Sequence, residues 1–194
     1  MNATRADKQA VIDIIVKSFD HIPGIKWIIG NNGNREKRLR AMADFIFEKA
    51  FARDGVVLSA DRQGVGIYFR FNGKKTSLRD YWNEIKFAFR CIGLARAGEI
   101  MNREKYILSQ RPADGNYIYY WMFGVKPDAR GNGAARELKN LIMEESRNQQ
   151  LPIYLETTVE KNRRVYERYG FQLYHTWHVE KRNVTIWFMK KEPH

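Results

Sequence analysis

One cysteine, Cys91, occurs among the 194 residues of the chain. A lone cysteine cannot form a disulfide within its own chain, and the scarcity of cysteine favours a reducing, cytoplasmic setting. Cys91 lies in an apolar helical pattern, which predicts a packing role rather than a nucleophile. No hydrophobic run approaches the roughly 20 residues that span a membrane, and the N-terminus lacks the apolar core of a signal peptide. The sequence therefore predicts a cytoplasmic protein without a membrane partner.

Acidic residues are fewer than basic residues in this chain. The chain has 22 Asp and Glu against 34 Lys and Arg, which gives a net charge of +12 at pH 7. This charge favours an anionic partner. The basic residues form small, separated clusters (Lys74–Lys75 is one) without a nucleic-acid-binding motif, so nucleic acid is not the expected partner.

Spacings typical of metal ligands are also missing. His175 and His178 lie three residues apart in an expected strand, so their side chains point to opposite faces of the sheet. No other group of residues has credible zinc-ligand spacing. The sequence therefore predicts no metal site.

Apolar residues, by contrast, make up 44% of the chain and aromatic residues 13%, which indicates a globular fold. The length suits one domain, residues 1–194, and no repeat or linker divides it. Helical periodicity covers 8–19, 35–53 and 77–108, with a break in the last near Gly93 or Gly98. Ile-Pro-Gly at 22–24 interrupts the first pattern, and a loop is expected at 30–34. Residues 56–60 and 64–71 predict an antiparallel hairpin.

The most informative stretch runs from 117 to 171. It predicts a strand at 117–125, a glycine-rich turn, a helix, a strand at 153–157 and a further helix, with two last strands at about 171–179 and 184–190. The turn and the start of its helix comprise Arg130, Gly131, Asn132, Gly133, Ala134, Ala135 and Arg136. A helix start has unpaired N–H groups and the positive end of the dipole, and glycines allow close approach of a ligand. We therefore expect this turn to bind a phosphate group.

Two other phosphate-binding motifs are excluded by the spacing. A dinucleotide fingerprint needs a third glycine, and a P-loop needs Gly-Lys-Ser/Thr. Purely structural interpretations remain for each residue of the pattern. Gly131 and Gly133 would suit an ordinary helix entry, Asn162 a helix N-cap, Tyr166 an amphipathic core position, and Gly170 a helix C-cap.

Taken together, the motifs resemble the GNAT acetyltransferase superfamily. The resemblance rests on an aromatic strand that ends in Val-x-Pro, on Arg-x-x-Gly-x-Ala at 130–135, and on Asn162 followed by Tyr166, Gly170 and Phe171. It is specific over the second half of the chain and diffuse over the first. Leu-Glu-Thr at 155–157 further resembles the puromycin-acetyltransferase-like branch, although this match is weaker.

The resemblance implies a fold and a cofactor. It implies an α+β domain with a mixed, mostly antiparallel central sheet flanked by helices, in which the strands through Phe123 and Glu156 splay apart. Acetyl-CoA, with its three phosphate groups, would enter between them as acetyl donor. Its amide-bearing arm would bond to the backbone of Phe123, Gly124 and Val125, and an N–H near Phe123 would polarise the thioester carbonyl. Asn162 would contact the same arm.

Two side chains are candidates for proton transfer. Tyr166 lies four residues after Asn162, on the same helix face, and its hydroxyl could protonate the leaving sulfur. Glu156 is a lone carboxylate in an apolar strand and could remove a proton from the amine, directly or through water. Alternatively, Glu156 faces solvent, pairs with an arginine, or simply binds a cationic acceptor.

The expected function is that of an N-acetyltransferase. It would move the acetyl group by direct transfer to a primary amine of an unidentified, small-molecule acceptor. Two alternatives stay open: a basic, non-catalytic module that binds nucleic acid or an acidic partner, and an acyl-CoA sensor. A homodimer is possible, but no residue pattern tests it.

Overall fold

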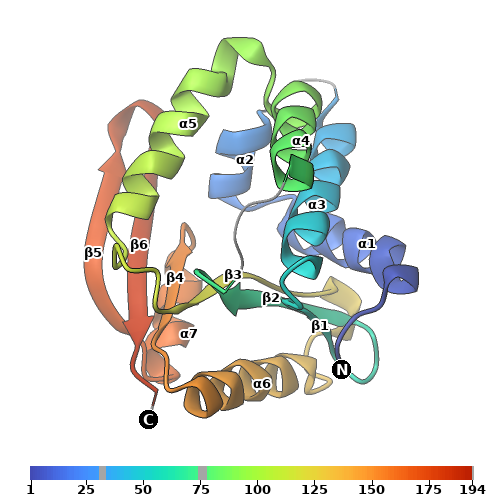
Figure 1. Cartoon of the computed structure of the whole chain (residues 1–194), viewed down its shortest axis with the longest axis vertical. Coiled ribbons are helices and arrows are strands. Elements are labelled where there is room, and N and C mark those ends of the chain that lie inside the picture. Colours follow the sequence, from blue (N-terminus) through green and yellow to red (C-terminus); the bar gives the residue numbers. More distant parts are fainter. Residues whose placement is uncertain (31–33, 74–77, 194) are drawn as a thin grey trace.

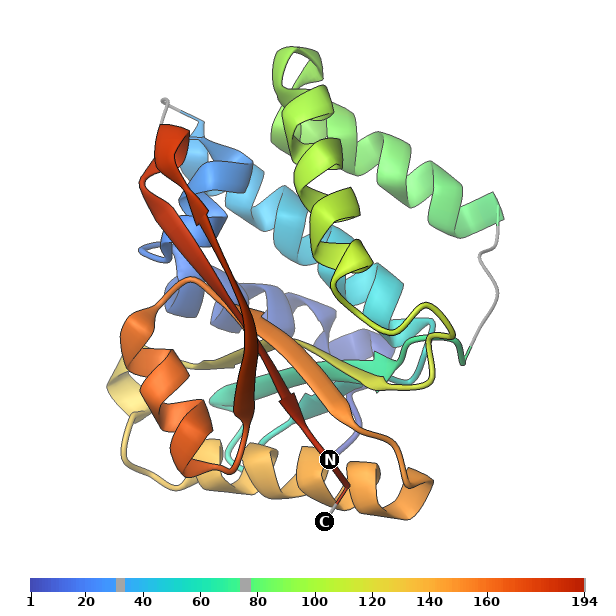
Figure 2. The same ribbon diagram turned by 90° about the vertical axis from the view of Figure 1, so that its left-hand side faces the viewer.

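The computed structural model describes residues 1–30, 34–73 and 78–193. Its centre is a six-stranded sheet in the order β1-β2-β3-β4-β6-β5. Helices α1 to α5 cover one face, and α6 and α7 cover the other (Figures 1 and 2). The predicted loop at 30–34 and the basic pair Lys74–Lys75 lie partly or wholly outside the described residues.

Five helices cover the first face. They are α1 (Lys8–Phe19), α2 (Pro23–Ile29), α3 (Arg35–Phe51), α4 (Leu78–Phe87) and α5 (Leu94–Ser109). The pattern at 22–24 does end α1, but Pro23 also begins α2, because a proline at the first helical position loses no hydrogen bond. The helical stretch after 77 breaks at Gly93 (φ +79°), where a π-helical turn (Ala88–Ile92) ends, and runs on through Gly98.

Antiparallel pairing dominates the sheet, as the sequence predicts. The strands are β1 (Val56–Leu58), β2 (Gly64–Arg70), β3 (Ile118–Val125), β4 (Ile153–Thr157), β5 (Gln172–Val179) and β6 (Val184–Lys191). Among them only β3 and β4 pair in parallel. The second face carries α6 (Ala134–Gln149) and α7 (Glu160–Arg168).

The parallel pair is short and opens into a fork. It has two rungs, Ile118 with Ile153 and Tyr119 with Tyr154. Beyond them, six residues of β3 and three of β4 continue without pairing to each other. The splayed strands implied by the resemblance are therefore present, with the fork opening toward Val125 and Thr157.

A β-bulge lies just inside this fork. Ile67 of β2 pairs with Met122, whereas Tyr68 pairs with Tyr120, so Trp121 is an extra residue on β3. The bulge interrupts the alternation of side chains. Met122 joins the core under α1 and α3, on the same side as Trp121, while Tyr120 and Phe123 pack on the side of α6. Period-two reasoning from sequence could not place these side chains.

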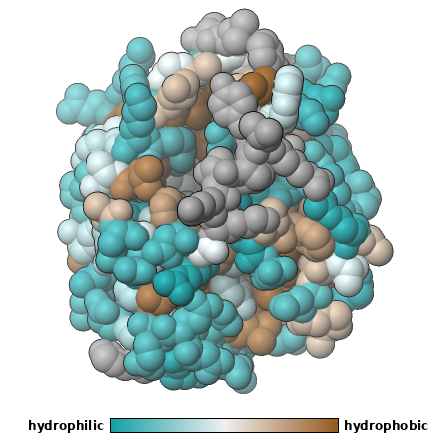
Figure 3. All heavy atoms as spheres, in the orientation of Figure 1, coloured by the Kyte–Doolittle hydropathy of each residue, from teal (hydrophilic) through white to brown (hydrophobic). Residues whose placement is uncertain are grey.

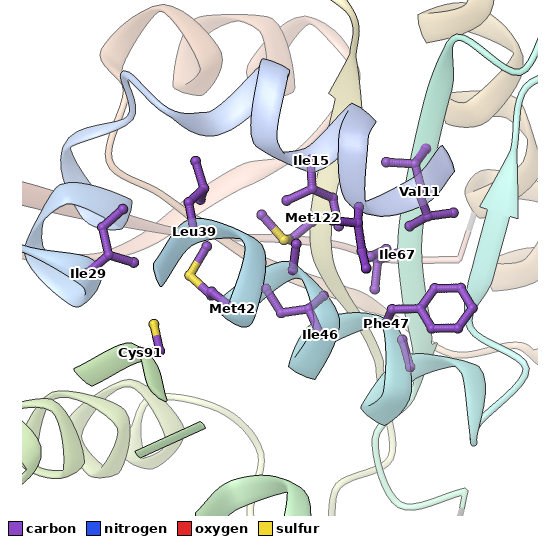
Figure 4. Close-up of a cluster of buried hydrophobic side chains, with 14 of the residues drawn as sticks. Val11, Ile15, Ile29, Leu39, Met42, Ile46, Phe47, Ile67, Cys91 and Met122 are labelled. Atoms are coloured by element: carbon purple, nitrogen blue, oxygen red, sulfur yellow. The ribbon is translucent and has the colours of Figure 1, made fainter. Parts of the chain in front are cut away.

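Two apolar cores stabilise the sheet, one on each face. Figure 4 shows part of the larger core, where side chains of α1, α3 and β3 meet around Ile15, Met42 and Met122. Cys91 lies at the border of this core and is fully buried. Burial raises the pKa of its thiol to about 12, so Cys91 stays uncharged at neutral pH. The predicted packing role of Cys91 is confirmed.

Hydrophilic residues cover most of the face shown in Figure 3. Within the described ranges, no helix is long and apolar enough to cross a membrane. No group of three potential metal-ligating side chains occurs among these same residues.

Candidate active site

The predicted phosphate turn follows β3 directly. After a short 3-10 turn (Pro127–Ala129), residues 130–133 lead into α6. Gly131 and Gly133 have φ values of +98° and +90°, which other L-residues rarely adopt. A Cβ placed on either glycine would meet no described atom within 4 Å. The glycines are therefore needed for backbone conformation, and they leave the turn open to a ligand.

The N-terminus of α6 has free hydrogen-bond donors. Its first backbone bond runs from the N–H of Glu137 to the carbonyl of Gly133 (3.0 Å), and Gly133 gives no side-chain cap. The N–H groups of Ala134, Ala135 and Arg136 consequently find no acceptor in the part of the chain that the structure describes. The exposed side chains of Arg130 and Arg136 add positive charge. This arrangement fits a phosphate group.

The backbone of β3 offers further donors at the fork. The N–H of Lys126 bonds to the carbonyl of Gln63 beside β2 (3.0 Å). Because amides alternate along an antiparallel strand, the N–H of Gly124 also faces β2, while those of Phe123 and Val125 face the opposite edge. That edge borders the gap between β3 and β4. The predicted cofactor-binding strand therefore presents two amides to the gap.

Helix α7 brings Asn162 and Tyr166 beside the fork. The helix begins at Glu160 with Val159 as N-cap, so the N-cap interpretation of Asn162 is wrong. Asn162 is exposed in the first turn, and Tyr166 follows one turn later. The ring of Tyr166 lies edge-on to Tyr120 of β3, with the ring centroids 6.2 Å apart. Tyr166 is thus placed against one arm of the fork.

The hydroxyl of Tyr166 is in its protonated form at neutral pH. Burial raises the pKa of Tyr166 above its ordinary value, and the neighbouring Tyr169 raises it further. A protonated hydroxyl can donate to a developing thiolate, so the predicted acid has the required form.

Gly170 ends α7 in a Schellman motif. The N–H of Phe171 bonds to the carbonyl of Tyr166 (3.0 Å), and the N–H of Gly170 bonds to that of Glu167 (2.9 Å). Gly170 has a φ of +85°, so its C-cap interpretation is confirmed. The motif also places Phe171 against the Tyr166 ring, with the centroids 5.6 Å apart.

Glu156 lies on β4, the second strand of the fork. It comes two residues after Tyr154, which forms the last β3–β4 pair with Tyr119. Its carboxylate accepts two hydrogen bonds of 2.7 Å from Nε and Nη2 of Arg111. Both side chains are almost inaccessible, at 9% and 5% exposure. Burial opposes the charge on Arg111, but Tyr119 and Glu156 outweigh it and raise the pKa of the guanidinium above its ordinary value. The arginine-paired alternative for Glu156 is therefore the one that the structure contains.

Aromatic side chains surround this ion pair. The guanidinium of Arg111 lies over the ring of Tyr119, 3.7 Å from its centroid. The buried hydroxyl of Tyr174 has no hydrogen-bond partner in the described ranges. Sequence reasoning missed Arg111, because it lies 45 residues before Glu156 and no local spacing joins the two.

Helices α1 and α2 cover the fork on the face of the sheet opposite α6. Ser18 and Phe19, at the end of α1, pack against Gly124 of β3. The N–H of Gly24 in α2 bonds to Oγ1 of Thr158, just after β4 (3.0 Å). The two arms of the fork are thus each tied to the N-terminal helices, on the side away from α6.

The sequence matches the model of the acetyltransferase (GNAT) family over residues 68–171, which is more than half of the chain. The chain therefore belongs to this acetyltransferase family. The family match supports acyltransferase activity in general.

Several solved structures share the fold. A protein described as histone acetyltransferase HPA2 and related acetyltransferase, from Corynebacterium glutamicum, is 21% identical with a TM-score of 0.69, over 100% of this chain and 95% of its own. The C-terminal condensation domain of Ebony, in complex with beta-alanyl-dopamine, has a TM-score of 0.73 at 15% identity, over 99% and 97%. Arylalkylamine N-acetyltransferase 2 from Aedes aegypti has a TM-score of 0.66 at 11% identity, over 100% and 98%. At these identities the similarity establishes the fold alone.

No curated protein matches the sequence. The resemblance to the puromycin-acetyltransferase-like branch stays a prediction.

Proposed function

We propose that the protein transfers an acetyl group from acetyl-CoA directly to the amine of a small acceptor. The observation that carries this proposal is the fork between β3 and β4, which has the phosphate turn at one end and Tyr166 and Glu156 on its two sides. Arg130, Asn132 and the amides of 133–136 would hold the pyrophosphate. Asn162 and the backbone of 123–125 would hold the arm that carries the thioester.

The proposed chemistry needs two proton transfers. The amine nitrogen attacks the thioester carbonyl carbon, and the N–H of Phe123 would stabilise the negative charge that develops on the oxygen. The C–S bond then breaks, and Tyr166 would give its proton to the sulfur. The proton lost by the nitrogen would pass to Glu156, directly or through water. An alkylamine is mostly protonated at pH 7, and its ammonium form has no lone pair. Only the neutral amine can therefore attack.

The acceptor would approach from the side of α1 to α5. That side of the fork carries Tyr119 and Trp121 as well as the Glu156 carboxylate. An aromatic surface suits an amine that carries an aromatic ring, and the Arg111-bound carboxylate keeps lone pairs that could accept a hydrogen bond from the amine nitrogen. The names of two structural neighbours, an arylalkylamine N-acetyltransferase and a domain that holds beta-alanyl-dopamine, make tyramine a sensible first probe.

Calorimetric titration with acetyl-CoA at two salt concentrations tests the donor. Micromolar, saturable binding is expected, and release of the free thiol is then followed with tyramine and a panel of other primary amines. Binding without turnover on any amine would favour a sensor. Absence of binding, together with salt-dependent binding of nucleic acid, would overturn the proposal in favour of a basic module.

A further inference from the structure

We propose that Arg111 is a positioning residue for the acetyl transfer, because it fixes the Glu156 carboxylate at the fork. This inference rests on the proposed function. Arg111 itself touches neither the phosphate turn nor α7 in the described structure. Its effect on turnover would therefore pass through Glu156.

The first support is the place of Arg111 in the fold. Arg111 follows the last turn of α5 and reaches both arms of the fork on the side away from α6. It stacks on Tyr119, which belongs to the last rung on β3, and it binds Glu156, which lies two residues beyond that rung on β4. One side chain thus spans the point where the strands separate.

The second support is the geometry of the pair. The planar guanidinium gives two nearly equal hydrogen bonds of 2.7 Å to the two carboxylate oxygens. A bidentate contact fixes both the position and the plane of the carboxylate, which a single contact cannot do. Each oxygen keeps a lone pair for an acceptor N–H or a water. Glu156 is consequently held still without being closed to hydrogen bonding.

The third support is the polar surroundings. Tyr174 brings a buried hydroxyl without a hydrogen-bond partner among the described residues. Burial raises the pKa of Tyr174, and the charge of Glu156 raises it further while Arg111 opposes it, so this ring lies within electrostatic reach of the pair. An unpartnered buried hydroxyl is costly. The Tyr174 hydroxyl therefore adds unused hydrogen-bonding capacity within electrostatic reach of Glu156.

A merely structural ion pair and a positioning pair predict different kinetics. If the pair only stabilises the fold, a variant that still folds keeps its turnover. If Arg111 positions Glu156, loss of the guanidinium lowers kcat/KM for the amine although the glutamate is intact. We expect the dissociation constant of acetyl-CoA to stay unchanged in both cases, because Arg111 binds Glu156 and Tyr119 and none of the residues proposed to hold the donor.

The experiment compares Arg111→Met, Arg111→Lys, Glu156→Gln and the double variant Arg111→Met/Glu156→Leu. Acetyl-CoA affinity is measured by calorimetry, and kcat and KM are measured with the best amine of the screen. We expect Arg111→Met and Glu156→Gln each to lose at least tenfold in kcat/KM, and the double variant to lose no more than Glu156→Gln. Arg111→Lys keeps the charge without the bidentate contact, and we expect an intermediate loss. It also keeps the test valid if Arg111→Met does not fold.

Arg5→Met is the control, because Arg5, itself 45% exposed, also binds a nearly buried glutamate, Glu48 of α3, which belongs to neither strand of the fork. It is expected to leave turnover unchanged. Wild-type kinetics in folded Arg111→Met and Arg111→Lys would overturn this inference and leave the proposed function standing. Failure of the wild-type protein to acetylate any amine would instead overturn the proposed function itself.

Discussion

Phe19 and Gly124 meet across the layer between α1 and β3. Cε2 of Phe19 lies only 2.7 Å from the position that a Cβ on Gly124 would take, and the Cβ of Ser18 lies 3.0 Å from it. The backbone amides of Phe123 and Val125, on either side of Gly124, are the ones that face the gap. Close packing of α1 therefore sets the position of the strand on which the donor is expected to bind.

Gly124→Ala should destabilise the protein, because its methyl group cannot fit without moving α1 from β3. Overpacking of this kind typically costs about 1–3 kcal/mol. Urea unfolding of the variant and the wild type measures the loss. Truncation of the opposing ring in Gly124→Ala/Phe19→Leu should restore part of the loss. Gly98→Ala is the control, since a Cβ there meets no described atom within 4 Å and alanine favours the helix. Equal stability of Gly124→Ala and the wild type would contradict the tight contact.

Tyr166→Phe should separate catalysis from binding. The ring contacts with Tyr120 and Phe171 persist in phenylalanine, so we expect acetyl-CoA affinity and folding to change little. Loss of the acid should lower kcat by roughly 10²-fold or more, which is typical of general acid catalysis. Steady-state kinetics and calorimetry on the same preparation measure both quantities. Wild-type kcat in the variant would remove Tyr166 as the acid.

The sequence predicts this fold well where the signal is local. Helices such as α1 and strands such as β4 have the residue ranges that their apolar periodicity indicates. The glycines at 131 and 133 identify the turn because their positive φ values are a property of the residues themselves. Such features need no knowledge of distant parts of the chain.

Features that depend on tertiary contacts could not be predicted. The bulge at Trp121 arises from the register between β2 and β3, and the sequence of β3 alone shows no sign of it. The partner of Glu156 comes from a loop 45 residues earlier. Pro23 illustrates a different limit, since a proline marks a boundary without saying whether a helix ends or starts there.

Gly133→Val should weaken acetyl-CoA binding at least tenfold. A β-branched side chain would strain the left-handed backbone and project into the open turn that is expected to receive the phosphate. Gly93→Val is a matched control, because Gly93 also has a positive φ and an open Cβ position but lies between the π-helical turn and α5. Both variants should lose about 1–3 kcal/mol of stability from backbone strain, because both glycines have conformations that valine rarely adopts. Calorimetry should show weakened binding only for Gly133→Val, and equal affinities would argue against the phosphate turn.

Lowering the pH should weaken the contact between α1 and α3, because this contact depends on the ionised carboxylate of Glu48. Burial opposes ionisation, but hydrogen bonds from Arg5 and Lys8 outweigh it and lower the pKa of Glu48 to about 2. Because the folded pKa lies below the ordinary value of 4.5, this stabilisation is present above pH 4.5 and is lost as the pH falls toward 2. Glu48→Gln should therefore show a shallower decline of unfolding free energy across this range, measured by urea titration at several pH values. Parallel curves for variant and wild type would contradict the assignment.

Arg111→Met should destabilise the protein far more than removal of both partners. The single variant leaves the Glu156 carboxylate buried without its counter-charge, which typically costs about 3–5 kcal/mol. In Arg111→Met/Glu156→Leu no buried charge remains, and apolar side chains of similar size can pack against Tyr119, so most of the loss should be recovered. Urea unfolding of the wild type, Arg111→Met, Glu156→Leu and the double variant forms a complete thermodynamic cycle. Additive losses would mean that Arg111 and Glu156 contribute independently, and the ion pair would then not be the unit that holds the two arms of the fork.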